Sequence, residues 1–90
     1  MASIEIFAGP NCSYCARAKA LLAARGLRYV ERDIAEDVHR NELLLRLPRS
    51  RSIPQIFIDG EHIGGCEDLE ILDRQGLLAP LTDLDRNPAV

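Results

Sequence analysis

A two-residue turn between two short apolar segments constrains the fold of this 90-residue chain more than any other feature. Asp59 and Gly60 separate an apolar run at residues 56–58 from a second short segment at residues 61–63. Both residue types tolerate the positive φ angles that a tight hairpin turn of type I′ requires. The two segments are therefore expected to pair as antiparallel strands, so the sheet that contains them is at least partly antiparallel.

The N-terminal half of the chain predicts a parallel unit ahead of this hairpin. An alternating strand is expected at residues 3–7, followed by a helix rich in Ala, Leu and basic residues at 13–25 and by a second strand at 27–34. Gly26 lies where the glycine that ends a helix is expected. A strand, a helix and a strand joined in this way within about 30 residues form a right-handed parallel crossover.

Further helices complete the predicted order. One is expected from Glu36 to just before Pro48, another from about Cys66 to Gly76, and a short amphipathic turn at residues 77–84. The order β-α-β-α-β-β-α-α predicts an α/β fold in which a four-stranded mixed sheet is covered by helices on both faces.

Length and composition indicate one small domain. The chain carries 11 basic and 14 acidic residues, so no basic surface is expected for nucleic acid or an anionic membrane. Its longest apolar stretch, residues 20–24, is far shorter than the ~20 residues of a membrane helix, and its N-terminus does not resemble a cleaved signal peptide. We expect a cytoplasmic domain at residues 1–84 followed by a short flexible tail at residues 85–90.

Two of the three cysteines form a Cys-x-x-Cys motif at the expected start of the first helix. Cys12 and Cys15 lie where free backbone N–H groups and the helix dipole stabilise an anion. A thiol in such a position ionises with a pKa of roughly 3.5–7.5 instead of about 8.5, and Arg17 and Lys19 add positive charge. We expect Cys12, at the exposed helix tip, to be the nucleophile and Cys15, on the buried face, to be the resolving thiol.

Other interpretations of the cysteines remain open from spacing alone. Cys12, Cys15, His62 and Cys66 supply a Cys₃His set for zinc, although the segment between Cys15 and His62 is longer than the roughly 12–20 residues of common zinc modules. Without zinc, His62 is expected to be an ordinary solvated side chain. Cys66 is either a small buried hydrophobe or a reactive thiol, and the first role is favoured. A reduced pair at a helix start favours redox chemistry over zinc binding.

Two loops are candidate binding segments. Pro54, at the start of an inner strand, is explained by a cis bond, by a strand end kept open for a ligand, or by simple strand initiation. The segment at residues 64–68 places two glycines ahead of a helix whose N–H groups could hold a carboxylate, or is an ordinary capped loop. Arg51 and its neighbouring arginines could bind acidic groups or are ordinary surface residues.

Together these segments resemble a known family. Cys-x-Tyr-Cys before an Arg- and Ala-rich helix, followed by Ser-Ile-Pro-Gln-Ile-Phe-Ile-Asp-Gly-Glu-His-Ile-Gly-Gly-Cys-Glu-Asp-Leu, resembles the dithiol glutaredoxins, most closely their small bacterial type. The resemblance extends from residue 3 to about residue 84. It implies a thioredoxin fold with a cis proline at Pro54 facing the cysteines, and a glutathione-dependent thiol-disulfide oxidoreductase.

The resemblance also implies how glutathione would be held. Tyr14 would flank it, Ile53 would pair with its backbone, and the Cys66 N–H with Asp68 would hold its γ-glutamyl end. The family usually carries a basic residue where this chain has Gly9, and Arg51 is the candidate replacement. The candidate glutathione-binding residues are Tyr14, Arg51, Ile53, Pro54, Gly65, Cys66, Glu67 and Asp68.

The implied reaction is thiolate exchange on glutathionylated or disulfide-bonded client proteins by a monomer. Cys12 would attack a glutathione mixed disulfide, and Cys15 would be needed only for protein disulfides. Ser13 replaces the proline that usually stands between the two cysteines. Some family members with serine there bind a [2Fe-2S] cluster between two subunits through the first cysteine and glutathione. A cluster-bridged dimer that acts as a carrier or sensor, with Cys12 as the iron ligand, is therefore the alternative function.

Overall fold

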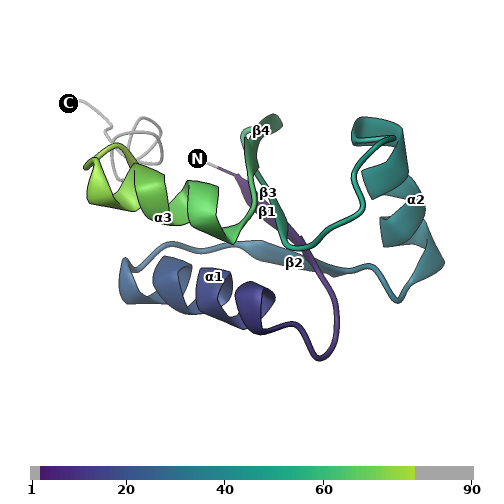
Figure 1. Ribbon diagram of the computed structural model, residues 1–90, viewed down its shortest axis with the longest axis horizontal. Helices are drawn as coiled ribbons and strands as arrows, with labels where there is room; N and C mark the ends of the chain where they lie inside the picture. The colour runs from purple at the N-terminus through teal and green to yellow at the C-terminus, as the bar shows by residue number, and fades with distance from the viewer. Residues whose placement is uncertain (1–2, 79–90) are drawn as a thin grey trace.

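The inner strand β1 (Ile4–Ala8) is buried along its whole length. In the computed structural model, which describes residues 3–78, the strand order is β2-β1-β3-β4 (Figure 1). β1 pairs in parallel with β2 (Val30–Asp33) and antiparallel with β3 (Gln55–Ile58), and β3 pairs antiparallel with β4 (Glu61–Gly64). The predicted four-stranded mixed sheet is confirmed.

The turn between β3 and β4 has the backbone that its residues predict. Asp59 has φ 52° and Gly60 has φ 84°, so both central residues adopt the positive φ of a type I′ turn. Asp59 also holds the start of the chain, because its N–H donates to the Ser3 carbonyl at 2.7 Å and its carboxylate accepts from the Ser3 N–H at 2.8 Å. The register of the hairpin shifts between the Phe57 and Ile56 pairs, next to the start of β3.

Helices cover both faces of the sheet, as predicted. α1 (Ser13–Ala24) and α3 (Cys66–Arg74) lie together on one face, and α2 (Asp37–Arg46) lies on the other (Figure 1). Most of the core is on the α1 and α3 side, where aliphatic side chains and two cysteines pack. Its buried members are Ile4, Ile6, Ala8, Cys15, Ala18, Leu22, Ile56, Ile58, Cys66, Leu69 and Leu78.

The contact of α2 with the sheet is small and partly ionic. Leu43 is the helix's one buried residue, and it packs with Phe7 and Phe57. The guanidinium of Arg46 lies over both rings, 5.3 and 4.8 Å from their centroids, and donates to the Glu5 carboxylate at 2.8 and 3.2 Å. A buried carboxylate in the middle of β1 is therefore neutralised by an arginine from α2, with help from Arg32 at 2.9 Å.

Two predictions differ from the structure or fall outside it. The second strand was expected at residues 27–34 and begins only at Val30, because the Leu27 N–H still bonds the Leu22 carbonyl in the turn that ends α1. The turn at 77–84 lies mostly outside the described residues, as does the boundary between 84 and 85, and Leu77 is exposed, not packed beside the buried Leu78. Within residues 3–78, no helix is long and apolar enough to cross a membrane.

Candidate active site

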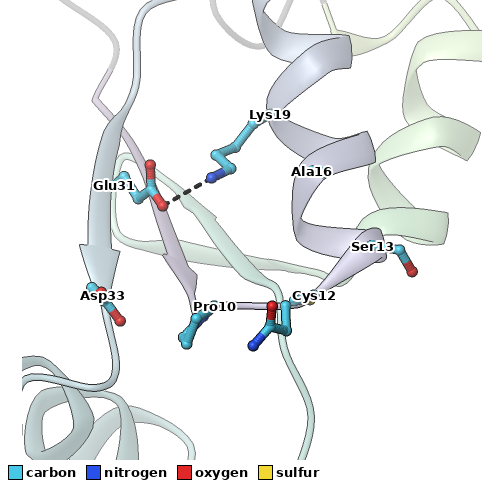
Figure 2. Close-up of a pocket in the computed structure, with 9 residues that line it drawn as sticks. Pro10, Cys12, Ser13, Ala16, Lys19, Glu31 and Asp33 are labelled. Atoms are coloured by element: carbon cyan, nitrogen blue, oxygen red, sulfur yellow. Dashed lines mark hydrogen bonds and ion pairs between the residues drawn. The ribbon is translucent and has the colours of Figure 1, made fainter.

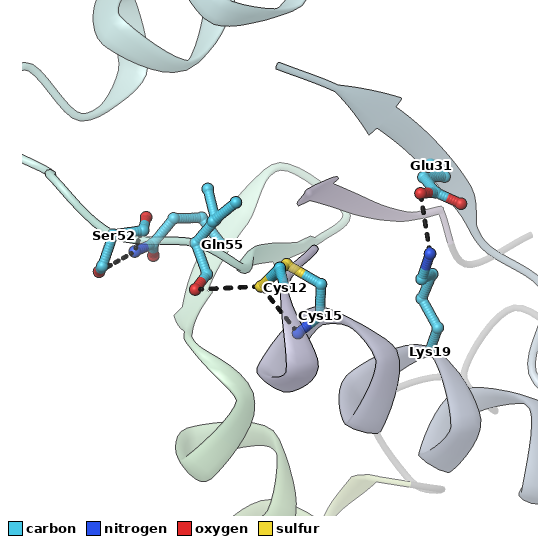
Figure 3. The surroundings of a disulfide bond; sticks show 7 residues. Cys12, Cys15, Lys19, Glu31, Ser52 and Gln55 are labelled. Carbon is cyan, nitrogen blue, oxygen red and sulfur yellow. Dashed lines mark hydrogen bonds and ion pairs between the residues drawn. A yellow bond between two sulfur atoms is a disulfide. The ribbon is translucent and has the colours of Figure 1, made fainter. Parts of the chain in front are cut away.

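Cys12 caps the N-terminus of α1. Its backbone is extended, with φ −116°, and its sulfur accepts a hydrogen bond from the Cys15 N–H at 3.1 Å. The two cysteines are joined by a disulfide with their Cα atoms 5.2 Å apart (Figure 3). As predicted, Cys15 lies on the buried face of the helix and Cys12 lies at its tip, but Cys12 is half-buried and not exposed as expected, because it packs against the core and lies near the Ile53 carbonyl. When the pair is reduced, the same N–H can donate to a Cys12 thiolate, which is a stronger acceptor than a disulfide sulfur.

The two cations on α1 are not free counter-ions for Cys12. Lys19 donates to Glu31 on β2 at 3.0 Å (Figure 2), and Arg17 donates to Glu70 on α3 at 2.7 Å. The expectation that both add positive charge at Cys12 is corrected, because each is paired with a carboxylate. The stabilisation of a thiolate at Cys12 therefore rests on the helix N-terminus itself.

The loop before β3 lies against the cysteines. The Ile53-Pro54 peptide bond is cis, as the resemblance implied, and the Ile53 carbonyl oxygen is 3.9 Å from the Cys12 sulfur. The buried Gln55 amide donates to the carbonyl and the hydroxyl of Ser52, at 3.0 and 3.2 Å (Figure 3). Gln55 thus fixes the backbone of the cis-proline loop from inside the sheet.

His62 is exposed, as expected of a solvated side chain, but it also makes two contacts that were not expected. Its Nε2 lies 2.8 Å from the Gln55 Oε1, and its ring packs 5.2 Å from that of Phe57. The amide of Gln55 donates to Ser52, so its oxygen is the acceptor and the imidazole is the donor in this contact. His62 therefore supports the cis-proline loop indirectly, by orienting the Gln55 amide that bonds Ser52.

A groove of about 340 Å³ runs beside this loop, between the starts of α1 and α3. We refer to it as the cis-proline groove. It contains all the candidate glutathione-binding residues except Arg51, which is exposed and does not line it. Ser52 also lines it, a residue that sequence reasoning placed in the motif but not in the binding set. The lining residues are Tyr14, Ser52, Ile53, Pro54, Gly65, Cys66, Glu67 and Asp68.

Two glycines shape the edges of the site. Gly64 has φ +124°, and a Cβ there would collide with the Asp68 side chain, whose carboxylate accepts from the Gly65 N–H at 2.9 Å. Gly9 has an ordinary φ, but a Cβ there would come within 2.9 Å of the Ile53 Cδ1 atom. The side chain of Ile53 thus occupies the space next to the position where the family usually has a basic residue. Neither constraint was recognised from the sequence.

Cys12 is not among the residues that line the cis-proline groove, but it lines a second, larger groove of about 660 Å³. It is bounded by the loop before α1, the exposed side of that helix and the edge strand β2 (Figure 2). The Lys19–Glu31 ion pair forms part of its wall. Cys12 therefore lines this groove, while its sulfur lies 3.9 Å from the Ile53 carbonyl oxygen of the cis-proline loop.

The third cysteine is held in an unreactive form. Cys66 is buried, and burial together with the nearby Glu70 carboxylate raises the pKa of its thiol, so the thiol stays protonated. This agrees with the small buried hydrophobe that was favoured. The zinc interpretation fails on geometry, because residues 3–78 contain no group of three His, Cys, Asp or Glu side chains placed to hold a metal ion.

Comparison with known proteins gives one family. The sequence model of the Glutaredoxin family matches residues 4–63. Glutaredoxin 3 of Escherichia coli K12 is 44% identical over 81 residues, which cover 90% of this chain and 98% of the relative.

Solved structures give the same result. The solution structure of glutaredoxin from Brucella melitensis is 44% identical and superposes with a TM-score of 0.75, covering 89% of this chain and 87% of that one. The buckwheat glutaredoxin-glutathione complex is 32% identical with a TM-score of 0.77, covering 88% and 74%. The thioredoxin fold that the sequence resemblance implied is confirmed by these neighbours.

Proposed function

The chain belongs to the glutaredoxin family, and from this premise we propose that it is a thiol-disulfide oxidoreductase that uses glutathione and has Cys12 as its nucleophile. Thiol oxidoreductase activity follows from the family. The observation that supports Cys12 as the nucleophile is its position, since its sulfur caps α1 and accepts from the Cys15 N–H at 3.1 Å. A sulfur so placed is stabilised as a thiolate, and the thiolate is the reactive form.

The proposed reaction on a glutathionylated substrate needs one cysteine. The Cys12 thiolate attacks the glutathione sulfur, the bond between glutathione and the substrate breaks, and the substrate leaves as a thiolate that takes a proton from water. A second glutathione thiolate then attacks the glutathione sulfur bound to Cys12, which releases glutathione disulfide and restores the Cys12 thiolate. The Cys15 N–H stabilises the charge on Cys12 at the start and at the end of this cycle.

A client protein with a disulfide needs both cysteines. Cys12 forms a mixed disulfide with one client sulfur, and Cys15 then attacks Cys12 and frees the reduced client. The product is the Cys12–Cys15 disulfide present in the structure, which two glutathione molecules would reduce. We propose that the protein acts on such clients as a monomer in the cytoplasm, where glutathione keeps thiols reduced.

The cis-proline groove is the proposed site for glutathione. Tyr14 would form one wall, the backbone of Ile53 would pair with the tripeptide, and the start of α3 would hold the γ-glutamyl carboxylate through free N–H groups beside Asp68. Cys66 and Glu67 would contribute their backbone, and Gly65, whose N–H is bonded to Asp68, would line the site. Support comes from the buckwheat relative, which is described as a glutathione complex. Arg51, exposed ahead of the groove, is proposed to meet the glycine carboxylate from the solvent side.

Substitution of the two cysteines tests the division of roles. Cys12→Ser should lower the reduction of a glutathionylated peptide by glutathione at least about 1000-fold, because it removes the nucleophile. Cys15→Ser should retain most of that activity and lose the reduction of a protein disulfide. Steady-state assays on both substrates measure this difference. Equal losses in the two variants would contradict the assignment.

The alternative function, binding of a [2Fe-2S] cluster, is supported by one feature. Ser13 is exposed next to the half-buried Cys12, whereas Cys15 and Cys66 are buried, so Cys12 is the thiol that a second copy could approach. A cluster of this kind needs four ligands, typically thiolates. Two copies of Cys12 and two glutathione thiols would supply them. Anaerobic purification with glutathione should give a brown dimer, and a colourless monomer after reconstitution would exclude this function.

A further inference from the structure

Two ion pairs join α1 and the residue that follows it to α3. One terminal nitrogen of Arg17 donates to both oxygens of Glu70 at 2.7 Å, whereas Arg25 donates from Nε and a terminal nitrogen to the two oxygens of Asp73 at 2.7 and 2.6 Å. The arginine side chains are equally exposed, at 52% and 51%. The two pairs are therefore expected to make similar, small contributions to the packing of these helices, as exposed ion pairs do.

Only the first pair reaches the cis-proline groove. The guanidinium carbon of Arg17 lies 5.2 Å from the centroid of the Tyr14 ring, and Tyr14 lines the groove. Among the described residues, Arg25 makes no such ring contact. Since 49% of Tyr14 is exposed, packing alone leaves its ring several possible rotamers.

We propose that Arg17 and Glu70 are positioning residues, which hold the Tyr14 ring as a fixed wall of the cis-proline groove. Glu70 on α3 fixes the guanidinium of Arg17, and the guanidinium fixes the ring through a cation–π contact. A wall that is already ordered does not have to be ordered when the ligand binds, so affinity is gained without a new contact to the ligand. This inference rests on the proposed function, because it assigns glutathione to this groove.

The ion pair also links the two walls of the groove. Tyr14 belongs to α1, whereas Cys66, Glu67 and Asp68 belong to the first turn of α3. Glu70 lies one turn further along α3 and is bonded to the residue that packs on Tyr14. The aromatic wall and the α3 N-terminus are thus joined by a contact that does not itself line the groove.

Two variants, each of which removes one of the two ion pairs, distinguish a positioning role of Glu70 from a purely stabilising one. Glu70→Gln should raise the KM for a glutathionylated peptide about two- to fivefold with a smaller change in kcat, the range expected from an exposed cation–π contact. Asp73→Asn removes the matching pair and should leave KM unchanged. Urea denaturation should show similar losses of stability in both variants. Equal changes of KM in Glu70→Gln and Asp73→Asn would overturn the proposal.

A double-mutant cycle tests the path through the ring. In a Tyr14→Leu background, Glu70→Gln should have almost no further effect on KM, because the wall it positions is absent. Additive effects of the two substitutions would contradict the proposed path and indicate that Glu70 acts through α3 alone.

A spectroscopic readout that needs no substrate completes the test. The Arg17 side-chain protons over the Tyr14 ring should be shifted upfield by the ring current in NMR spectra of the wild-type protein and of Asp73→Asn, and not in Glu70→Gln. A wild-type protein that shows this shift but no glutathione-dependent turnover would overturn the proposed function. Normal wild-type turnover with an unchanged KM in Glu70→Gln would overturn only the positioning role.

Discussion

At the residue scale, Gly64 is placed where no other side chain fits without disturbing the groove. Its φ of +124° is open mainly to glycine, and an added Cβ would collide with the Asp68 carboxylate that accepts from Gly65. Gly64→Ala should therefore lower the free energy of unfolding by about 1–3 kcal/mol and raise the KM for a glutathionylated peptide. Urea denaturation and steady-state kinetics measure the two effects.

Gly60 provides the control for this substitution. It has φ +84° in the hairpin turn, but a Cβ there would meet nothing within 4 Å. Gly60→Ala should share the backbone strain and leave the KM at its wild-type value. If Gly64→Ala also leaves the KM unchanged, the contact between Gly64 and Asp68 does not shape the groove.

The sequence predicts the surroundings of the two motif cysteines but not the ion-pair partners of Arg17 and Lys19. The environments of Cys12 and Cys15 follow from a motif at a helix start, because the helix supplies both the free N–H groups and the buried face. The partners of Arg17 and Lys19 could not be predicted, since Glu70 and Glu31 belong to other elements and an ion pair depends on how these pack. The requirement for glycine at position 64 likewise depends on a contact between elements, because the Asp68 side chain of α3 folds back to accept from the Gly65 N–H beside it.

At the element scale, α2 is held to the sheet by an ion pair that depends on pH. The hydrogen bonds from Arg46, with the one from Arg32, hold the pKa of the Glu5 carboxyl below its ordinary value of 4.5. The unfolded chain therefore binds this proton more readily, so the pair stabilises the fold above about pH 4.5 and the contribution is lost as the pH falls through the lower, folded pKa.

Glu5→Gln should remove this contribution. The variant should be less stable than the wild type by about 1–3 kcal/mol at pH 7, because the glutamine makes weaker hydrogen bonds to the arginines. The difference should shrink as the pH is lowered below 4.5, where the wild-type carboxyl takes up its proton. Urea denaturation from pH 7 to pH 3 measures both curves, and parallel curves would contradict this account of α2.

The elements themselves were predictable where the local pattern is strong. The hairpin and the ends of α1 and α3 follow from glycines and from residues that favour helix starts. The buried face of α2 could not be read from its sequence, because Leu43, Leu44 and Leu45 are consecutive and show no helical period. In the structure only Leu43 of the three is buried, and Arg46 makes much of the contact with the sheet. The start of β2 could not be predicted from the sequence. The alternation of polar and apolar residues begins at Leu27, but Leu27 is still bonded to the end of α1 and the strand begins only at Val30.

At the scale of the whole molecule, the strand order brings the site together. β3 runs antiparallel to β1, and Gln55 pairs with Phe7, so the loop containing Pro54 lies beside the loop that leads from β1 to Cys12. The start of α3 reaches the same end of the sheet through the β3–β4 hairpin. Local patterns predicted a mixed sheet but not this order, so the convergence of the three segments was implied only by the family resemblance.

The central claim is that Cys12 takes glutathione directly from a glutathionylated substrate. It is tested most directly by mass spectrometry of the Cys15→Ser variant after brief reaction with a glutathionylated peptide and no free glutathione. The account predicts that one glutathione becomes bound to the protein, that peptide mapping places it on Cys12, and that the peptide is released with a free thiol. A disulfide between the peptide and the protein, or glutathione on Cys66, would contradict it.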